Sequence, residues 1–308
     1  MTAVSSAGPL VSIVIPYFEQ EEFLLEAVGS VSAQTYGNFE IVVVDDCSEG
    51  RSAREVLSEC ELPALRIIRH EQNQGPAASR NTAVRESAGA LILPLDADDM
   101  ITADYLEVTT AAFADDPEIG AVFTNARLFG DEDALWRPQC SLASILCYGL
   151  PNSFLFKREV FASIGGYNPA LRLGENSDYW LRAQQCGWRF QHIDEPLYLY
   201  RRHSRAKTRS QGFLSERARV LVREHKQLFV DHLEDILLEQ TARYLEQWDI
   251  YKDAYQQYEV LNSDIFQQYE ELKHYHEHAT ANAHEAETSF IGRLASMFGL
   301  KALPGRGI

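Results

Sequence analysis

The chain has 308 residues, a formal net charge of −17 and a hydrophobic content of 45%. The length allows one α/β domain with an appendage, and the hydrophobic content excludes an intrinsically disordered chain. The negative charge argues against a nucleic-acid-binding protein, because the charged phosphates would repel it.

Short apolar segments alternate with amphipathic segments along the first half of the chain. We expect strands, in chain order, at residues 10–15, 41–44, 65–68, 91–95, 121–128 and 196–200. We expect helices at residues 22–33, 52–59, 76–87, 157–164 and 178–186. This alternation is typical of βαβ units, and it predicts an α/β fold with a mainly parallel sheet.

Acidic side chains directly follow two of these strands. The strands at 41–44 and 91–95 run into Asp45, Asp46, Asp96, Asp98 and Asp99. Open α/β sheets bind ligands at the carboxyl ends of their strands, and crowded carboxylates suit a hard cation that bridges to phosphate oxygens. The pattern predicts a Mg²⁺ or Mn²⁺ site. The alternative is a solvated loop in which Asp99 caps a helix that begins near Thr102.

The C-terminal third of the chain has a different pattern. No glycine or proline occurs between Phe213 and Gly292, and a seven-residue repeat covers about residues 241–279. The repeat predicts a coiled coil and therefore a homo-oligomer, although a single helix packed on the first domain would also explain it. We accordingly divide the chain into a domain at 1–209, a helical extension at 210–289 and a tail at 290–308.

The tail at residues 290–308 is basic and amphipathic, so it could lie in a membrane interface or dock on protein. No apolar run approaches the roughly 20 residues that span a bilayer, and the N-terminus lacks the features of a signal peptide. The five cysteines form no CxxC pair and no zinc-like cluster. We therefore expect a cytoplasmic protein with reduced thiols, with peripheral contact at the inner membrane face as an alternative.

Several motifs in a fixed order resemble family 2 glycosyltransferases of the bacterial cell-surface polysaccharide type. They occupy residues 11–17, 34–36, 44–48, 73–81, 95–99, 164–167, 175–182 and 200–203. The resemblance covers about residues 10–207. It implies a GT-A fold and transfer of a sugar, with inversion, from a nucleotide diphosphate sugar to a glycan or lipid-linked saccharide acceptor.

The resemblance also implies roles for individual residues. The donor would contact Pro16, Tyr17, Phe18, Asp46, Arg80, Asp96, Arg202 and His203. Asp98 would be the main ligand of Mn²⁺ or Mg²⁺, with Asp96 and His203 in the same shell, and Asp45 would hold its loop. The physical reason is general, because a cation and nearby Arg or His side chains stabilise the charge that grows on a leaving diphosphate.

The chain departs from the family at the catalytic base, which inversion requires and which is normally a carboxylate. The family carries an aspartate where this chain has Asn176, and an amide takes up no proton near neutral pH. We expect Glu175 to act as the substitute base and consider Asp178 next. Asp178 could instead be a first-turn acid of its helix.

Three readings of Asn176 remain at this point. A neighbouring carboxylate replaces the base, Asn176 only positions the acceptor in a slow enzyme, or the protein is a sugar-nucleotide-binding scaffold with weakened catalysis. A nucleotidyltransferase or a Rossmann dehydrogenase is disfavoured, because no glycine-rich phosphate loop follows the first strand.

Overall fold

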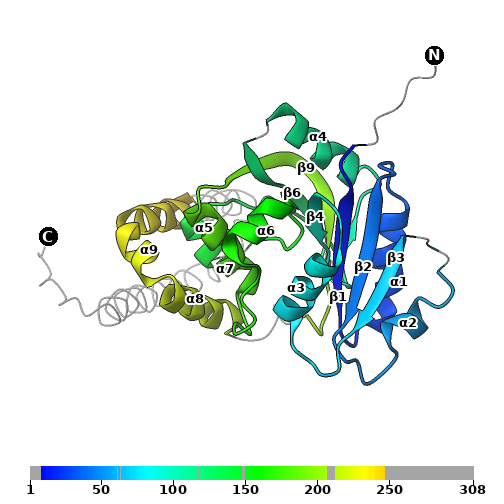
Figure 1. The fold of residues 1–308 in the computed structure, drawn as a ribbon. Helices are drawn as coiled ribbons and strands as arrows, with labels where there is room; N and C mark the ends of the chain where they lie inside the picture. The colour runs from blue at the N-terminus through cyan, green and yellow to red at the C-terminus, as the bar shows by residue number, and fades with distance from the viewer. Residues whose placement is uncertain are drawn as a thin grey trace, which may run out of the picture. The chain divides into compact units, whose positions relative to one another are not determined.

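The structure is a computed structural model that describes residues 8–60, 62, 64–116, 118–147, 150–206 and 212–246 (Figure 1). The chain divides into a compact unit, Met1–Leu237, and a second unit, Leu238–Ile308. Of the second unit, only residues 238–246 are described, and they are helical. The remainder of the predicted coiled coil and the whole tail at 290–308 lie outside the described residues, so both stay predictions.

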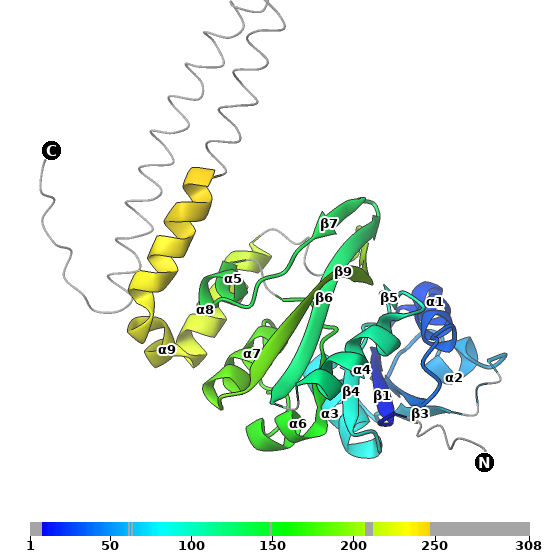
Figure 2. The ribbon, with the colours of Figure 1, turned by 90° about the horizontal axis from the view of Figure 1, so that it is seen from above.

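In the described part of the first unit, a nine-stranded sheet organises the chain, with the order β3-β2-β1-β4-β8-β6-β9-β5 and β7 paired to β6. The strands are β1 (Val11–Tyr17), β2 (Phe39–Asp45), β3 (Leu65–Arg69), β4 (Leu91–Pro94), β5 (Met100–Ile101), β6 (Ile119–Gly130), β7 (Ala134–Trp136), β8 (Leu155–Lys157) and β9 (Arg189–Arg202). Figure 2 shows the long β6 and β9 side by side.

The prediction of a mainly parallel sheet is confirmed by the strand pairings. The pairings β1–β2, β1–β4, β2–β3 and β6–β9 are parallel and hold the longest registers. The antiparallel pairings β4–β8, β5–β9, β6–β7 and β6–β8 each join only two or three residue pairs. The parallel part carries the two strand ends that run into acidic residues.

Helices cover both faces of the sheet. They are α1 (Glu21–Ser32), α2 (Ala53–Val56), α3 (Pro76–Glu86), α4 (Tyr105–Asp115), α5 (Leu142–Cys147), α6 (Arg158–Ile164), α7 (Glu175–Gln185), α8 (Phe213–Glu224) and α9 (Lys226–Asp231). Side chains of β1 alternate between two cores, one shared with α1 and the other with α3 and α7. Burial on both faces explains why the central strands are almost entirely apolar.

Most predicted elements form within a few residues of their expected bounds, although β9 begins at Arg189, seven residues before the strand expected at 196–200. Two helices also differ from the expectation in an informative way. Helix α2 is short: Ser52 and Glu55 form a capping box at its start, and it ends at Val56. Helix α7 begins three residues before the expected Asp178, after Gly174 in the left-handed conformation. The early start places Glu175 and Asn176 in the first turn of α7.

Helices α8 and α9 belong to the first compact unit, although the sequence assigned them to the extension after residue 209. Leu221 of α8 and Phe229 of α9 are buried in the same core as α7. Among the described residues, no helix has the length and apolar character needed to cross a membrane.

Candidate active site

The carboxyl ends of the central parallel strands open onto a cavity of about 760 Å³. It is lined by the following residues that the sequence singled out: Pro16, Tyr17, Phe18, Asp46, Arg80, Asp96, Asp98, Glu175, Asn176, Arg202 and His203. Asp178 is absent from this lining. The fold therefore brings every predicted site residue except Asp178 to one cavity.

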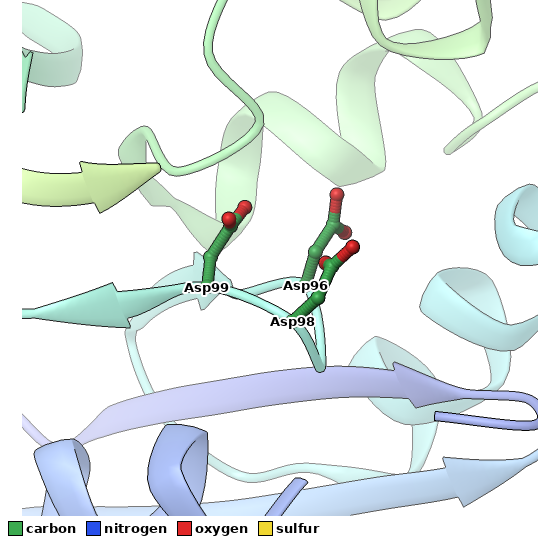
Figure 3. Close-up of side chains that lie close together, drawn as sticks. All are labelled: Asp96, Asp98 and Asp99. Atoms are coloured by element: carbon green, nitrogen blue, oxygen red, sulfur yellow. The ribbon is translucent and has the colours of Figure 1, made fainter. Parts of the chain in front are cut away.

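Three aspartates crowd the loop that follows β4. One oxygen from each of Asp96, Asp98 and Asp99 lies within 4.8 Å of the others, and Figure 3 shows the side chains on the same side of the loop. Burial, and then the charge of Asp96, raises the pKa of Asp98, although His203 partly offsets this. Burial, followed by the charges of Asp98 and Asp96, raises the pKa of Asp99 well above its usual range. Such an all-oxygen cluster fits a hard divalent cation, which would relieve the repulsion.

Asp99 is not a helix cap, contrary to the alternative drawn from the sequence. Its Oδ1 accepts a hydrogen bond from the backbone N–H of Arg201 at 2.8 Å, and its Oδ2 accepts one from the Tyr198 hydroxyl. Helix α4 begins only at Tyr105. Asp99 therefore ties the acidic loop to β9, and Asp98 and Asp96 are the cluster members that reach the cavity.

The end of β9 brings an arginine and a histidine side chain to the same cavity. His203 Nε2 lies 3.0 Å from Asp98 Oδ2, and the His203 ring packs against Phe23 with centroids 4.9 Å apart. Arg202 forms an ion pair with Glu132, at 3.3 Å. The imidazole of His203 therefore lies beside Asp98, and the guanidinium of Arg202 lines the same cavity.

Asp45 and Asp46, at the end of β2, hold two loops through backbone hydrogen bonds. Asp45 accepts hydrogen bonds from the backbone N–H groups of Ser48 and Ala53, at 2.9 and 3.0 Å. This is the loop-holding contact expected for Asp45. Asp46 lines the cavity. It also accepts hydrogen bonds from the backbone N–H groups of Gly75, at 2.7 Å, and Gln74, at 3.0 Å.

His70 is a site residue that the sequence analysis missed. It follows β3 directly, and its Nδ1 lies 2.7 Å from Asp46 Oδ1 while its Nε2 lies 2.9 Å from the Thr82 hydroxyl. The sequence did hold a signal for His70, because a histidine that directly follows a predicted parallel strand lies at the sheet edge where ligands bind. Its contacts fix the orientation of Asp46 in the cavity wall.

Arg80 is buried, with 2% of its side chain exposed, and it joins two carboxylates of the site. It contacts Asp96 at 2.6 Å and Glu175 at 3.2 Å. Burial by itself would lower the pKa of Arg80, but the two carboxylates outweigh this effect and raise it. The guanidinium therefore stays charged and fixes Glu175 relative to the acidic loop.

Asn176 is also linked to the acidic loop. Its amide donates a hydrogen bond to Asn152 Oδ1, and the amide of Asn152 donates to Asp96 Oδ2. Asn176 Oδ1 is buried and has no hydrogen-bond partner in the described part of the chain. Asn152 was missed because it lies in the irregular segment before β8, where no sequence period marks it.

Asp178 lies in the first turn of α7 but is fully committed to other partners. It contacts Arg182 at 2.7 and 2.9 Å and His225 at 2.9 Å. Burial raises the pKa of Asp178, but the hydrogen bonds from His225 and Arg182 outweigh burial, so the net pKa is lowered. The geometry matches the first-turn acid rather than the base.

Comparison with known proteins decides the family. The profile of "Glycosyl transferase family 2" matches residues 12–180, more than half of the chain. The chain belongs to glycosyl transferase family 2. An uncharacterized glycosyltransferase of Haemophilus influenzae is 30% identical over 229 residues, which cover 70% of this chain and 76% of the relative.

Two solved structures share the GT-A fold of this glycosyltransferase. The TarS 1–349 fragment of S. aureus, in complex with UDP-GlcNAc, has a TM-score of 0.56 at 21% identity and covers 67% of this chain and 60% of its own. The mannosyltransferase PcManGT of Pyrobaculum calidifontis, with GDP-Man and Mn²⁺, has a TM-score of 0.52 at 20% identity and covers 65% and 59%. The chain thus spans about 60% of each solved chain. The predicted GT-A fold is confirmed.

The glycosyltransferase cavity has a second, mostly apolar wall. Trp136 of β7 and Tyr200 of β9 line it with ring centroids 5.8 Å apart. Leu150, which precedes β8, and Phe213, the first residue of α8, also line the cavity. Helix α8 lies beyond the residues that match the family profile, so the sequence motifs could not assign it to the site.

Proposed function

We propose that this protein is a metal-dependent, inverting glycosyltransferase that moves a sugar from a nucleotide diphosphate sugar to a hydroxyl group of a glycan or lipid-linked saccharide. The observation that carries the proposal is the pairing of Asp98 with His203 at the cavity, beside Asp96. This arrangement combines oxygen ligands for a cation with a side chain that can contact phosphate. UDP-GlcNAc and GDP-Man are bound by the two structural neighbours, which supports a donor of this class.

One part of the cavity, around Asp96, Asp98, Arg202 and His203, would stabilise the diphosphate as it leaves the sugar. Asp98 and Asp96 would hold Mn²⁺ or Mg²⁺, with His203 beside them, and the metal would neutralise charge on the diphosphate. Pro16 to Phe18 and Asp46 line the part of the cavity where we place the nucleoside. Arg202 stands at the same end as His203 and contributes a further positive charge as the bond to the diphosphate breaks.

Glu175 is the base that we assign. Its Oε1 is fixed by Arg80, its side chain lines the cavity, and only 13% of it is exposed. An acceptor hydroxyl oxygen attacks the anomeric carbon, the bond to the diphosphate breaks, and the hydroxyl proton passes to Glu175. A carboxylate positioned in this way contributes about 10²–10⁴-fold to the rate of such a step.

Release of nucleoside diphosphate tests the proposal. Wild type would be incubated with UDP-, GDP- and dTDP-sugars plus Mn²⁺ or Mg²⁺, with and without p-nitrophenyl glycosides as acceptors. We expect metal-dependent release that Asp98→Ala abolishes and an anomeric configuration that is inverted in the product by NMR. Release that persists in Asp98→Ala or with EDTA would contradict metal dependence, and a retained configuration would contradict inversion.

A sugar-nucleotide-binding scaffold is the second candidate, and it is favoured by the neutral Asn176 at the family's base position. It predicts tight donor binding by calorimetry with no release from any donor. We further propose that the protein is cytoplasmic and associates through its helical extension. Light scattering of the full chain against a variant truncated after residue 246 tests that association, and flotation with anionic vesicles tests peripheral membrane contact by the tail.

A further inference from the structure

Two hydrogen-bonded bridges start from the same carboxylate and end on consecutive residues of α7. Asp96 Oδ1 contacts Arg80, which contacts Glu175. Asp96 Oδ2 accepts from Asn152, whose Oδ1 accepts from Asn176. Because Glu175 and Asn176 are neighbours in the first turn of α7, the two bridges close a ring between the acidic loop and the helix that carries the base.

The charge of Asp96 fixes the direction of every hydrogen bond in the second bridge. A carboxylate only accepts hydrogen bonds, so Asn152 must turn its NH₂ group toward Asp96. Its carbonyl oxygen then faces Asn176, which must also donate. Neither amide can be flipped without placing a carbonyl oxygen against another acceptor.

This order of donors excludes an effective carboxylate at position 176. A carboxylate there would present one oxygen to the carbonyl of Asn152, with which it cannot form a hydrogen bond. The other oxygen would take the place of Asn176 Oδ1, which is buried without a donor in the described residues. A charge that is buried with no donor on either oxygen is strongly disfavoured.

We propose that Asn152 is a positioning residue of the transfer reaction. It holds the first turn of α7, and thereby Glu175, at a fixed place relative to Asp96, and it requires a neutral donor at position 176. The inference rests on the proposed transfer reaction and extends it, because it assigns a role to a residue outside all the motifs. It also gives a physical reason why this chain carries Asn176.

A double-mutant cycle tests the assignment, using Asn152→Leu, Asn176→Asp and the two together. Leucine has a similar size and forms no hydrogen bond. We expect Asn152→Leu to lower kcat for nucleoside diphosphate release about tenfold, with donor KM and the Mn²⁺ concentration for half-maximal rate unchanged, because Arg80 still holds Asp96. Asn176→Asp should also lower kcat. Adding Asn152→Leu to Asn176→Asp should lower it no further, because the repelling carbonyl is then gone.

Three results would overturn the proposal. The first is a kcat for Asn176→Asp above that of wild type, and the second is a kcat of the double variant that falls by the product of the two single losses. The third is an Asn152→Leu variant that changes only the Mn²⁺ concentration for half-maximal rate. Asn38→Leu is the matched control. Asn38 immediately precedes β2 and donates a hydrogen bond to the backbone carbonyl of Gly8, so it lies at the end of β2 that is remote from Asp45. It should behave as wild type.

Hydrogen exchange gives a second readout that needs no turnover. The peptide spanning residues 172–182 should exchange faster in Asn152→Leu than in wild type or Asn38→Leu, while peptides of β1 and β2 stay unchanged. If wild type releases no diphosphate from any donor, the proposed function fails and this exchange alone decides the inference. Equal exchange in Asn152→Leu and wild type would overturn it.

Discussion

His203 Nε2 lies 3.0 Å from Asp98 Oδ2, although the two residues are 105 positions apart in the chain. The contact joins the end of β9 to the loop after β4, at the part of the cavity where we propose that the metal binds. We expect His203→Gln to raise the Mn²⁺ concentration for half-maximal rate and to lower the rate about tenfold to a hundredfold, as for loss of a side chain that orients a metal ligand. The measurement is diphosphate release against Mn²⁺ concentration.

The matched control is His192→Gln. His192 stacks on Phe123 and bonds Asn125, and it does not line the cavity. Its Mn²⁺ dependence should equal that of wild type. An unchanged Mn²⁺ requirement in His203→Gln would show that His203 has no part in the metal site.

Glu175→Gln should keep donor binding and lose transfer. The amide keeps the size of the side chain but accepts no proton, so kcat should fall about 10²–10⁴-fold while the Kd for the nucleoside diphosphate with Mn²⁺ changes little. Assays of nucleoside diphosphate release measure kcat, and calorimetry measures the Kd for the nucleoside diphosphate with Mn²⁺. A variant with wild-type kcat would mean that Glu175 is not the base.

Asp178→Asn should act on stability, because Asp178 is buried between Arg182 and His225. Removing one partner of such a pair should lower the free energy of unfolding by about 3 kcal/mol at pH 7. The net pKa of Asp178 is lowered in the folded state, so its contribution is present above the unfolded pKa of about 4 and is lost as pH falls through the folded pKa. Urea unfolding of both proteins from pH 7 downward should therefore show a difference that shrinks only at acid pH. A difference that grows on acidification would contradict this assignment.

Mn²⁺ should stabilise the wild-type protein. The carboxylates of Asp96, Asp98 and Asp99 crowd one another, and a cation that binds only the folded state raises Tm by mass action. Differential scanning fluorimetry with EDTA, Mn²⁺ or Mg²⁺ should show an increase of a few degrees at saturating metal in wild type and none in Asp98→Ala. Equal shifts in both proteins would place the bound cation elsewhere.

Trp136→Ala should weaken use of the acceptor. Trp136 lines the apolar wall next to Tyr200, and a large ring offers a flat surface to the apolar face of a sugar. We expect the KM for a p-nitrophenyl glycoside to rise about tenfold, with donor hydrolysis unchanged. Leu135→Ala is the control, since Leu135 is exposed on the same strand and does not line the cavity. If both variants leave the acceptor KM unchanged, this wall does not bind the acceptor.

Local signals determined most of the elements and one part of the site. The β-branched run at 41–44 predicted a strand buried on both faces, and the acids after it and after Leu95 were expected at one sheet edge. The family motifs then placed Asp98 and His203 together. Helix α7 starts earlier than its apolar pattern predicted, because Gly174 in the left-handed conformation precedes its first residue. The spacing of apolar residues does not reveal such a glycine.

Tertiary structure decided which carboxylates are free to act. Both Glu175 and Asp178 are candidate bases in the sequence, with Glu175 preferred. In the structure Asp178 is held by Arg182 and His225, while Glu175 faces the cavity beside Arg80. The partner His225 comes from beyond α8, 47 residues away. The sequence by itself determined many of the elements, the acidic loop and the family, because periodicity and motifs are local, but it did not predict β5, β7, β8 or α5. The neighbours of each charge depend on how distant segments pack, so only the folded chain could show that Asp178 is held by Arg182 and His225.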